Sequence, residues 1–209
     1  DIKNIALTGS YGSGKSTILK TFQKNYKGTE LKFLNISLAT FKEEKTKLDD
    51  EVLAKKYSKE GVRIIGLRYF NVFGERQSKN YAGVIKLFLE RIKNYDPPII
   101  NGNGSQIRDF VYVKDVVRAN IMALESNVEN GFINIGTGKT ISILELANQI
   151  VKSSNLKLDL IHQDALKGDV MESKADVSLA KKLLNWEYNI ELNEWLEDIV
   201  PRLLKNKKE

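Results

Sequence analysis

A glycine-rich segment near the start of the chain holds the residue types that a phosphate-binding loop needs. It reads Gly9-x-x-x-x-Gly14-Lys15-Ser16 and follows a short apolar strand pattern. Glycines let backbone N–H groups converge on phosphate oxygens, a lysine reaches the terminal phosphates, and a serine hydroxyl binds Mg²⁺. We therefore predict phosphate binding, with ATP and Mg²⁺ as a suitable ligand pair and Ser16 as the metal ligand. The predicted contacts are Gly9, Gly12, Gly14, Lys15, Ser16 and Thr17.

Nucleotide hydrolysis needs more than this loop. It requires an acidic residue at the end of a second buried strand to hold Mg²⁺, and a group that positions water. The only later strand pattern that ends in an acid runs from Leu158 to Asp164, and it alternates with polar residues. We therefore expect no NTPase turnover. Residues 2–42 resemble the opening of bacterial YobI-like P-loop NTPase domains, through Asn4-Ile-Ala-Leu-Thr-Gly-Ser-Tyr-Gly-Ser-Gly-Lys-Ser-Thr17 and Ile36-Ser-Leu-Ala-Thr-Phe41.

Two other interpretations of the loop are open. One is a plain turn between a strand and a helix. The other is a dinucleotide-binding turn, Thr-Gly-x-x-Gly-x-x-Gly, whose first half matches Thr8-Gly9-x-x-Gly12. Lys15 stands where that motif has its third glycine, which permits close approach to a pyrophosphate. Because a lysine there crowds a dinucleotide, we interpret this match as coincidental.

The later part of the chain carries four longer motifs. The four motifs are Gly66-Leu-Arg-Tyr-Phe-Asn-Val-Phe-Gly-Glu-Arg-Gln77, Arg108-Asp-Phe-Val-Tyr-Val-Lys-Asp-Val116, Phe132-Ile-Asn-Ile-Gly-Thr-Gly138 and Gly168-Asp-Val-Met-Glu-Ser-Lys-Ala-Asp176. From residue 46 on, these motifs resemble, in order and spacing, the extended short-chain dehydrogenase family of NAD-dependent nucleotide-sugar epimerases and dehydratases. UDP-glucose and UDP-N-acetylglucosamine 4-epimerases are the nearest match.

The resemblance implies a catalytic Tyr-x-x-x-Lys pair, one helical turn apart. In that family the lysine lowers the tyrosine pKa, and the tyrosinate takes a sugar hydroxyl proton as hydride leaves for NAD. Lys47 matches the catalytic lysine, but Glu43 stands where the family has tyrosine. Most of the family's NAD pocket also has no counterpart. We therefore expect no epimerase turnover, and we interpret the chain as a chimera joined near residues 41–45.

The resemblance also implies a largely intact sugar-nucleotide side. Residues 84–88 and 99–102 are expected to flank the uracil, and the planar fork of Arg108 suits bidentate contact with the diphosphate. Leu166 stands where the family has a second arginine, which weakens this side. The residues assigned by resemblance are Tyr69 and Phe70 beside the nicotinamide of NAD, and Asn71, Val84 and Arg108 on the UDP-sugar.

Strand and helix patterns alternate along the chain, as in α/β proteins. We predict strands over residues 5–7, 31–38, 62–69, 110–113, 132–135 and 158–162. We predict helices over residues 15–23, 48–57, 81–94, 116–124, 141–151, 177–184 and 195–204. The expected fold is α/β, a truncated parallel Rossmann-like sheet covered by helices, with the small C-terminal substrate-binding part of an extended short-chain dehydrogenase. The expected domains are a P-loop fragment over residues 1–45 and the C-terminal portion of a sugar epimerase over residues 46–209.

The composition limits which kinds of site, partner and location we expect for this protein. The chain has 209 residues, no cysteine and a formal net charge of +6. Disulfides and thiolate metal sites are therefore excluded. The charge favours anionic ligands, but no groove-reading helix or stacking aromatics accompany it, so we predict no nucleic-acid partner. Without a long apolar run we predict no membrane span and expect a cytoplasmic protein. Open sheet edges favour a homodimer.

Together these features predict a UDP-sugar 4-epimerase-like fragment that binds a UDP-sugar but does not turn it over. One alternative is an ATP-binding P-loop module with a passenger C-terminal domain, and another is a folded scaffold without a ligand. Of the remaining polar and aromatic residues, we expect Asp109 and Asp115 to brace turns and His162 to hold no metal. We expect Trp186 and Trp195 to pack in the core or at its edge.

Overall fold

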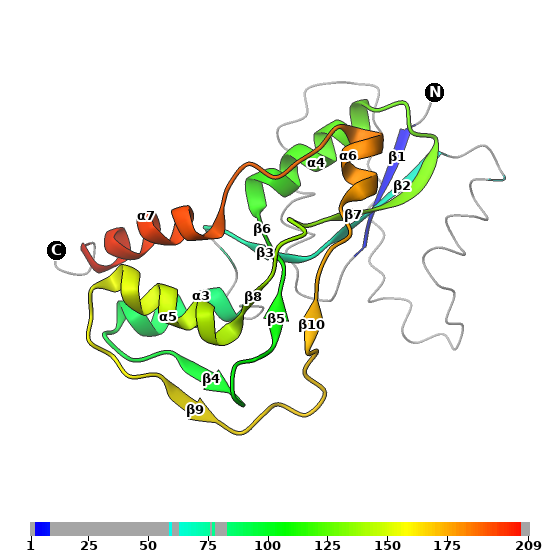
Figure 1. The fold of residues 1–209 in the computed structure, drawn as a ribbon. Helices are drawn as coiled ribbons and strands as arrows, with labels where there is room; N and C mark the ends of the chain where they lie inside the picture. Colours follow the sequence, from blue (N-terminus) through cyan, green and yellow to red (C-terminus); the bar gives the residue numbers. More distant parts are fainter. Residues whose placement is uncertain (1–2, 9–58, 60–62, 76, 78–82, 206–209) are drawn as a thin grey trace, which may run out of the picture.

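The computed structural model describes residues 3–8, 59, 63–75, 77 and 83–205 of the chain. Strands and helices alternate along it (Figure 1). In chain order the strands are β1 Lys3–Thr8, β2 Arg63–Tyr69, β3 Asn71–Phe73, β4 Ile99–Asn101, β5 Ile107–Arg108, β6 Phe110–Tyr112, β7 Asn130–Ile135, β8 Ile141–Ser142, β9 Ile161–Gln163 and β10 Glu172–Ser173. The helices are α3 Val84–Lys93, α4 Val113–Glu125, α5 Ile143–Ser154, α6 Ser178–Leu184 and α7 Leu192–Lys205.

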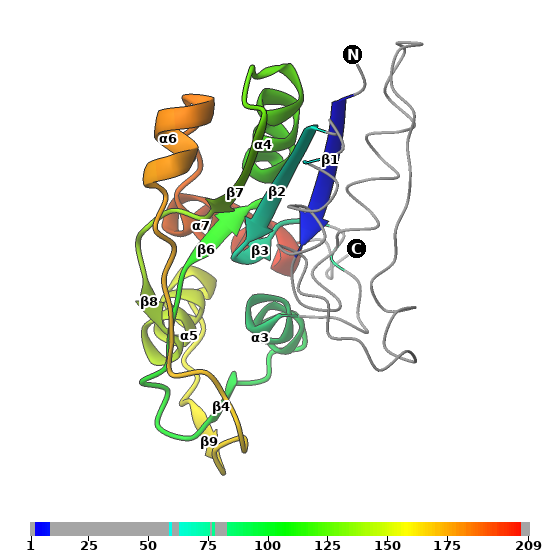
Figure 2. The same cartoon turned by 90° about the vertical axis from the view of Figure 1, so that its right-hand side faces the viewer.

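Strands β1, β2 and β7 form a parallel sheet, with β2 between the other two. Figure 2 shows β1 beside β2, and Thr8 at the end of β1 lies opposite Arg68. On its other side β2 pairs with β7, so that Tyr69 lies opposite Ile135. Parallel neighbours need a crossover connection, which is why strands distant in sequence meet here. The expected α/β class, a parallel sheet covered by helices, is confirmed.

One side of this sheet packs against α4 and α6 in a cluster that we call the sheet core. Ile65, Leu67 and Tyr69 alternate along β2 and all face this cluster, because side chains on a strand repeat with a period of two. On the other side the ring of Phe132 covers Gly66, where a β-carbon would lie 2.4 Å from it. Glycine is therefore required at that position. The sheet core comprises Ile65, Leu67, Tyr69, Val111, Val116, Ala119, Ala123, Ile133, Ile135, Ala180, Leu184 and Trp186.

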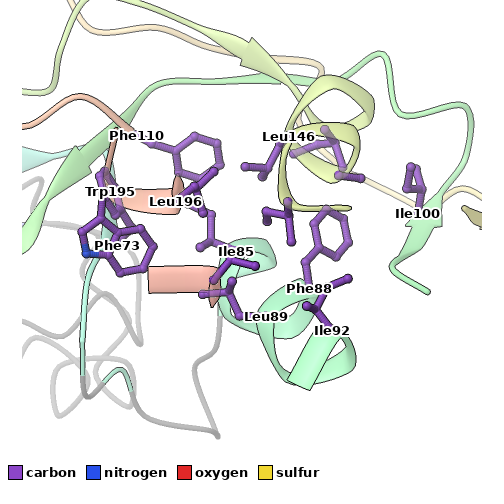
Figure 3. Packing of buried hydrophobic residues seen from close by; sticks show 14 of the residues in the cluster. Phe73, Ile85, Phe88, Leu89, Ile92, Ile100, Phe110, Leu146, Trp195 and Leu196 are labelled. Carbon is purple, nitrogen blue, oxygen red and sulfur yellow. The ribbon is translucent and has the colours of Figure 1, made fainter. Parts of the chain in front are cut away.

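Helices α3, α5 and α7 enclose a second cluster, the helical core (Figure 3). Phe88 and Ile92 lie one turn apart on α3, and Leu146 and Ile150 do so on α5, which gives each helix an apolar stripe. Each such buried side chain contributes about 1.5–3 kcal/mol to stability. The helical core comprises Phe73, Ile85, Phe88, Leu89, Ile92, Ile100, Phe110, Tyr112, Ile143, Leu146, Ala147, Ile150, Trp195, Leu196 and Val200.

Strand β6 belongs to both cores because its side chains alternate. Phe110 and Tyr112 point into the helical core, whereas Val111 points into the sheet core. β6 pairs in parallel with β3, and β5, just before it, pairs with β10 and β8. β4 and β9 form a separate parallel pair. The segment of residues 107–112 therefore runs between the two cores, and the candidate site is built on it.

The predicted elements within the described part of the chain are present, with shifted ends. The helix expected over residues 141–151 begins at Ile143, because Ser142 caps it. The short strands β3, β4, β5, β8 and β10 were not predicted, since two or three residues show no periodicity. The strand over residues 31–38 and the helices over residues 15–23 and 48–57 lie outside the described residues. No helix in the described part is long and apolar enough to cross a membrane.

Candidate functional site

The carboxyl ends of β2 and β7 meet at one edge of the sheet, and the segment that follows β2 is held there by backbone hydrogen bonds. The Phe70 N–H donates to the carbonyl oxygen of Ile135 at 3.0 Å. The Asn71 N–H and its Nδ2 both donate to the carbonyl oxygen of Asp109, at 3.1 and 2.9 Å. Crevices outside the carboxyl ends of parallel strands are the usual ligand sites of such sheets. Asn71, predicted to contact the sugar or phosphate, is therefore fixed at the expected edge.

Asp109, which is fully buried, braces this edge of the sheet. Its Oδ1 accepts the N–H and the hydroxyl of Thr137, both at 2.8 Å, and its Oδ2 accepts the N–H groups of Gly138 at 2.8 Å and Ala175 at 3.1 Å. At Gly136 a β-carbon would lie 2.5 Å from Ala175 and 2.9 Å from this carboxylate. The predicted bracing role of Asp109 is confirmed, and it excludes this carboxylate as an exposed acid.

Arg108 points away from that brace and forms an ion pair across the chain. Its Nη2 lies 2.7 Å from Oδ1 of Asp169, and its Nη1 donates to the Ile107 carbonyl oxygen at 2.9 Å. The side chain of Arg108 is 13% exposed and that of Asp169 is 28% exposed. The Asp169 carboxylate, which is partly exposed, thus accepts one of the guanidinium N–H groups that were predicted to bind a diphosphate. Leu166, on the same exposed turn, adds no charge.

Gln106 completes this polar group from the other side of Asp169. Its Nε2 donates to Oδ2 of Asp169 at 3.0 Å and to the carbonyl oxygen of Asn101 at 3.1 Å. Gln106 is buried, and its Oε1 has no hydrogen-bond partner. Asp169 therefore lies between two donors, one on each carboxylate oxygen.

Tyr69, which was assigned to the nicotinamide, packs in the sheet core. Its hydroxyl donates to Oδ1 of the buried Asn120 at 2.9 Å. Burial raises the pKa of the Tyr69 phenol strongly, although the hydrogen bond with Asn120 acts in the opposite direction. The Phe70 ring, by contrast, is half-buried at the end of β2. A contact between NAD and these two residues stays a prediction, and the phenol of Tyr69 is not turned toward the edge.

The two segments predicted to flank the uracil come together in the structure. Ile85 and Phe88 of the first segment and Ile100 of the second all pack in the helical core. Val84, the first residue of α3, is half-buried against the same cluster. The side chains of Ile85, Phe88 and Ile100 are thus used for packing, whereas Leu87 is exposed and Ile99 is half-buried.

Several predicted site residues lie outside the described residues. These are the candidate catalytic Lys47, with Glu43 at the tyrosine position, and the phosphate-loop residues Gly9, Gly12, Gly14, Lys15, Ser16 and Thr17.

Within the described part, the predictions for Asp115, Trp186 and Trp195 are met. Asp115 is buried and accepts the N–H groups of Asn189 at 2.9 Å and Ile190 at 3.1 Å. The exposed His162 places its Nδ1 2.8 Å from the Gly102 carbonyl oxygen. Among the residues that the structure describes, no group of His, Asp and Glu side chains is arranged to hold a metal ion. Trp186 and Trp195 are buried.

Sequence reasoning missed Gln106 and the pairing partner of Arg108. One signal for Gln106 was present, because residues i and i+2 of an extended segment share a face, which aligns Gln106 with Arg108. The pairing of Arg108 with Asp169 joins residues 61 positions apart, so no local sequence pattern predicts it.

Comparison with known proteins gives matches to two families. Residues 41–136 match the NAD dependent epimerase/dehydratase family, and residues 1–65 match the YobI-like P-loop NTPase family. A protein of Methanocaldococcus jannaschii, provisionally named UDP-glucose 4-epimerase, is 40% identical over 149 residues, which cover 71% of this chain and 48% of that protein. The chain thus spans about half the length of the curated relatives that it matches.

Solved structures show the same relationship. A UDP-glucose 4-epimerase from Thermotoga maritima, solved with UDP-glucose, is 34% identical with a TM-score of 0.70; the match covers 76% of this chain and 52% of that one. A UDP-glucuronic acid 4-epimerase from Bacillus cereus, solved with UDP-glucuronic acid and NAD, is 26% identical with a TM-score of 0.71. That match covers 98% of this chain and 62% of that one. The expected resemblance to both families is therefore confirmed.

Proposed function

Because residues 41–136 of this chain match the NAD dependent epimerase/dehydratase family, we propose that the chain binds a UDP-sugar but does not catalyse 4-epimerisation. The observation that carries the proposal is the position of Arg108. Arg108 directly precedes Asp109, whose carbonyl oxygen accepts the Asn71 amide, and the Arg108 guanidinium is fixed by the carboxylate of Asp169. A fixed guanidinium recognises a diphosphate by charge-assisted hydrogen bonds, and Asn71 adds an amide for a hydroxyl or phosphate oxygen.

The first prediction concerns Arg108 itself. Arg108→Ala is expected to weaken UDP-glucose binding about 10- to 100-fold, because a charge-assisted hydrogen bond is worth about 1.5–3 kcal/mol. Arg108→Lys keeps the charge but loses the fork, so it should recover only part of the affinity. Isothermal titration calorimetry measures both effects.

Arg202→Ala provides the matched control. Arg202 pairs with Asp198 on the exposed face of α7, so its removal changes the net charge equally but leaves the candidate site intact. Equal losses in Arg202→Ala and Arg108→Ala would contradict a specific role for Arg108. A wild-type chain that does not bind UDP-glucose at all would refute the proposed function.

The second prediction is the absence of turnover. A coupled assay of sugar 4-epimerisation with added NAD is expected to show none, because a glutamate at position 43 is a much weaker base than a tyrosinate. Turnover that survived Glu43→Gln would show that this position does not limit the chemistry.

NAD is the cofactor that the family implies. Of the described residues assigned to it, Phe70 alone lies half-buried at the sheet edge, while the Tyr69 phenol is bonded inside the sheet core. The described residues therefore do not form a nicotinamide pocket by themselves.

A second candidate function is binding of ATP with Mg²⁺ by the predicted phosphate loop, with Lys15 at the terminal phosphates and Ser16 at the metal. The match of residues 1–65 to a P-loop NTPase family supports it, as does the parallel strand β1, which ends at Thr8 immediately before the loop sequence.

A further inference from the structure

The geometry points to Gln106 as a positioning residue of the nucleotide site, which sets the place of Arg108 through the carboxylate of Asp169. This inference rests on the proposed binding of a UDP-sugar by Arg108. Three side chains form one chain of contacts: the Gln106 amide donates to Oδ2 of Asp169, and Arg108 donates to Oδ1 of the same carboxylate.

Of these three side chains, Gln106 is the one that the surrounding structure holds in place. Its carbonyl oxygen accepts the N–H of Ile143 at 2.9 Å, which ties it to the first turn of α5. Its side chain is buried, and the two hydrogens of its Nε2 serve two acceptors, Asn101 and Asp169. Neither the backbone nor the amide group of Gln106 is therefore free to turn.

The orientation of the Asp169 carboxylate depends on its two hydrogen-bond donors. Asp169 lies on a turn after Gly168, whose φ of +82° is a left-handed conformation, and every residue from 161 to 172 is exposed. Packing therefore does little to hold this turn, and the Asp169 side chain, 28% exposed, is held by its two hydrogen-bond donors. Its carboxylate takes its orientation from the two donors, Gln106 and Arg108, and holds the guanidinium in turn.

The position of Gln106 also carries a cost that packing alone does not explain. Its Oε1 is buried without a partner, which is unfavourable in a protein interior. The Gln106 amide leaves its own oxygen unpaired but donates both of its hydrogens to specific oxygens, those of Asn101 and Asp169. This pattern is consistent with a residue whose role is to orient Asp169.

Gln106→Glu tests this role because it changes a donor into an acceptor at constant shape. Near pH 8, two carboxylates face each other, so Asp169 is displaced and the affinity for UDP-glucose is expected to fall about tenfold. The neighbouring charge and burial raise the pKa of the new glutamate. Near pH 5 it is therefore expected to be protonated in part and to donate again, and the affinity returns toward that of wild type.

A compensating variant separates orientation from general damage. In the double variant Gln106→Glu with Asp169→Asn, the new asparagine can donate to Glu at 106 and still accept from Arg108, so binding near pH 8 is expected to recover. Gln149→Glu is the matched control. The Oε1 of Gln149 is likewise buried without a partner, and no hydrogen bond in the described structure joins Gln149 to Asp169 or Arg108. It should bind as wild type does if it folds.

Calorimetric titration of the full chain with UDP-glucose, at both pH values, reads out all variants, with circular dichroism to check folding. Gln106→Met lacks the donor at every pH and keeps the test decisive if Gln106→Glu does not fold; a loss at both pH values supports the proposal. Wild-type affinity in Gln106→Glu or Gln106→Met overturns it, and so does a loss in Gln106→Glu that neither acid nor Asp169→Asn reverses. Failure of the wild type to bind would instead refute the proposed function.

Discussion

At the scale of single residues, buried polar side chains determine the shape of the candidate site. Asp109 and Asp115 are both buried, and each accepts several N–H groups from distant segments. A buried carboxylate is tolerated only when such donors surround it. The bracing role of both residues was predicted, because each flanks an apolar strand. Their partners were not predictable, since Asn189 lies 74 residues after Asp115.

The hydroxyl of Tyr69 gives the third prediction. Tyr69→Phe is expected to destabilise the protein by about 1–3 kcal/mol, because it leaves Oδ1 of Asn120 without its donor in the sheet core. Chemical denaturation measures this change. Tyr188→Phe is the control: its hydroxyl contacts the half-exposed Glu191, so its loss should cost under about 0.5 kcal/mol.

The pH dependence of the same variant follows from the raised pKa of Tyr69. A phenol whose pKa is higher in the folded state stabilises the protein fully below its ordinary pKa of 10.0, and this contribution is lost as pH rises above that value. The stability difference between wild type and Tyr69→Phe should therefore narrow in strong alkali. A constant difference would show that the phenol is solvated, and so within reach of a ligand.

At the scale of elements, the first turn of α5 is the best-defined boundary near the site. The Ser142 hydroxyl accepts the Glu145 N–H at 3.1 Å, and the Glu145 carboxylate accepts the Ser142 N–H at 3.0 Å. This capping box satisfies N–H groups that a helix start otherwise leaves unpaired. It also fixes the turn whose Ile143 N–H bonds Gln106.

The fourth prediction is that Ser142→Ala costs about 1 kcal/mol of stability, measured by thermal or urea unfolding. Hydrogen bonds from the backbone and side chain of Ser142 lower the pKa of Glu145. A carboxyl with a lowered folded pKa stabilises above its ordinary value of 4.5 and loses that effect as pH falls through the folded value. The deficit of Ser142→Ala should therefore shrink in acid. Ser105→Ala, on an exposed turn, is expected to change nothing.

Helices were more predictable than strands at this scale. An apolar stripe marks α3 or α5 over ten or more residues, and packing in the helical core uses that stripe. Strands β5 and β10 have two residues each, and their pairing joins residues 107–108 to residues 172–173. Such strands form because the surrounding chain brings them together, so no local sequence period identifies them.

At the scale of the whole molecule, the parallel pairing of β1 with β2 bears on the expected division at residue 45. β1 lies in the part that matches a P-loop NTPase family, whereas β2 lies in the part that matches the epimerase family and begins where the P-loop match ends, at residues 63–65. Both strands end at the same edge of one sheet, where Asn71 is held. We propose that the parts over residues 1–45 and 46–209 are two segments of one sheet with separate ligands. The homodimer stays a prediction.

The fifth prediction tests the independence of the two ligands. Lys15→Ala is expected to abolish binding of ATP with Mg²⁺, because the loop loses the charge that reaches the terminal phosphates, and to leave UDP-glucose binding unchanged. Arg108→Ala is expected to do the reverse. Calorimetry with each ligand on both variants measures this pair of effects. If Lys15→Ala weakened UDP-glucose binding as much as ATP binding, the two parts would share one site instead.

The sequence by itself determined the α/β class, the apolar stripes of the helices and the family motifs, from which the assignment of Arg108 to a diphosphate is a prediction. These follow from local periods and from residue types at short spacings, which a linear chain displays directly. Only the tertiary structure decided that Tyr69 turns into the sheet core, that Asp169 contacts both Arg108 and Gln106, and that β1 lies beside β2. These depend on contacts between residues 51 to 63 positions apart, or on strand pairing, and such contacts form only when the whole chain is packed.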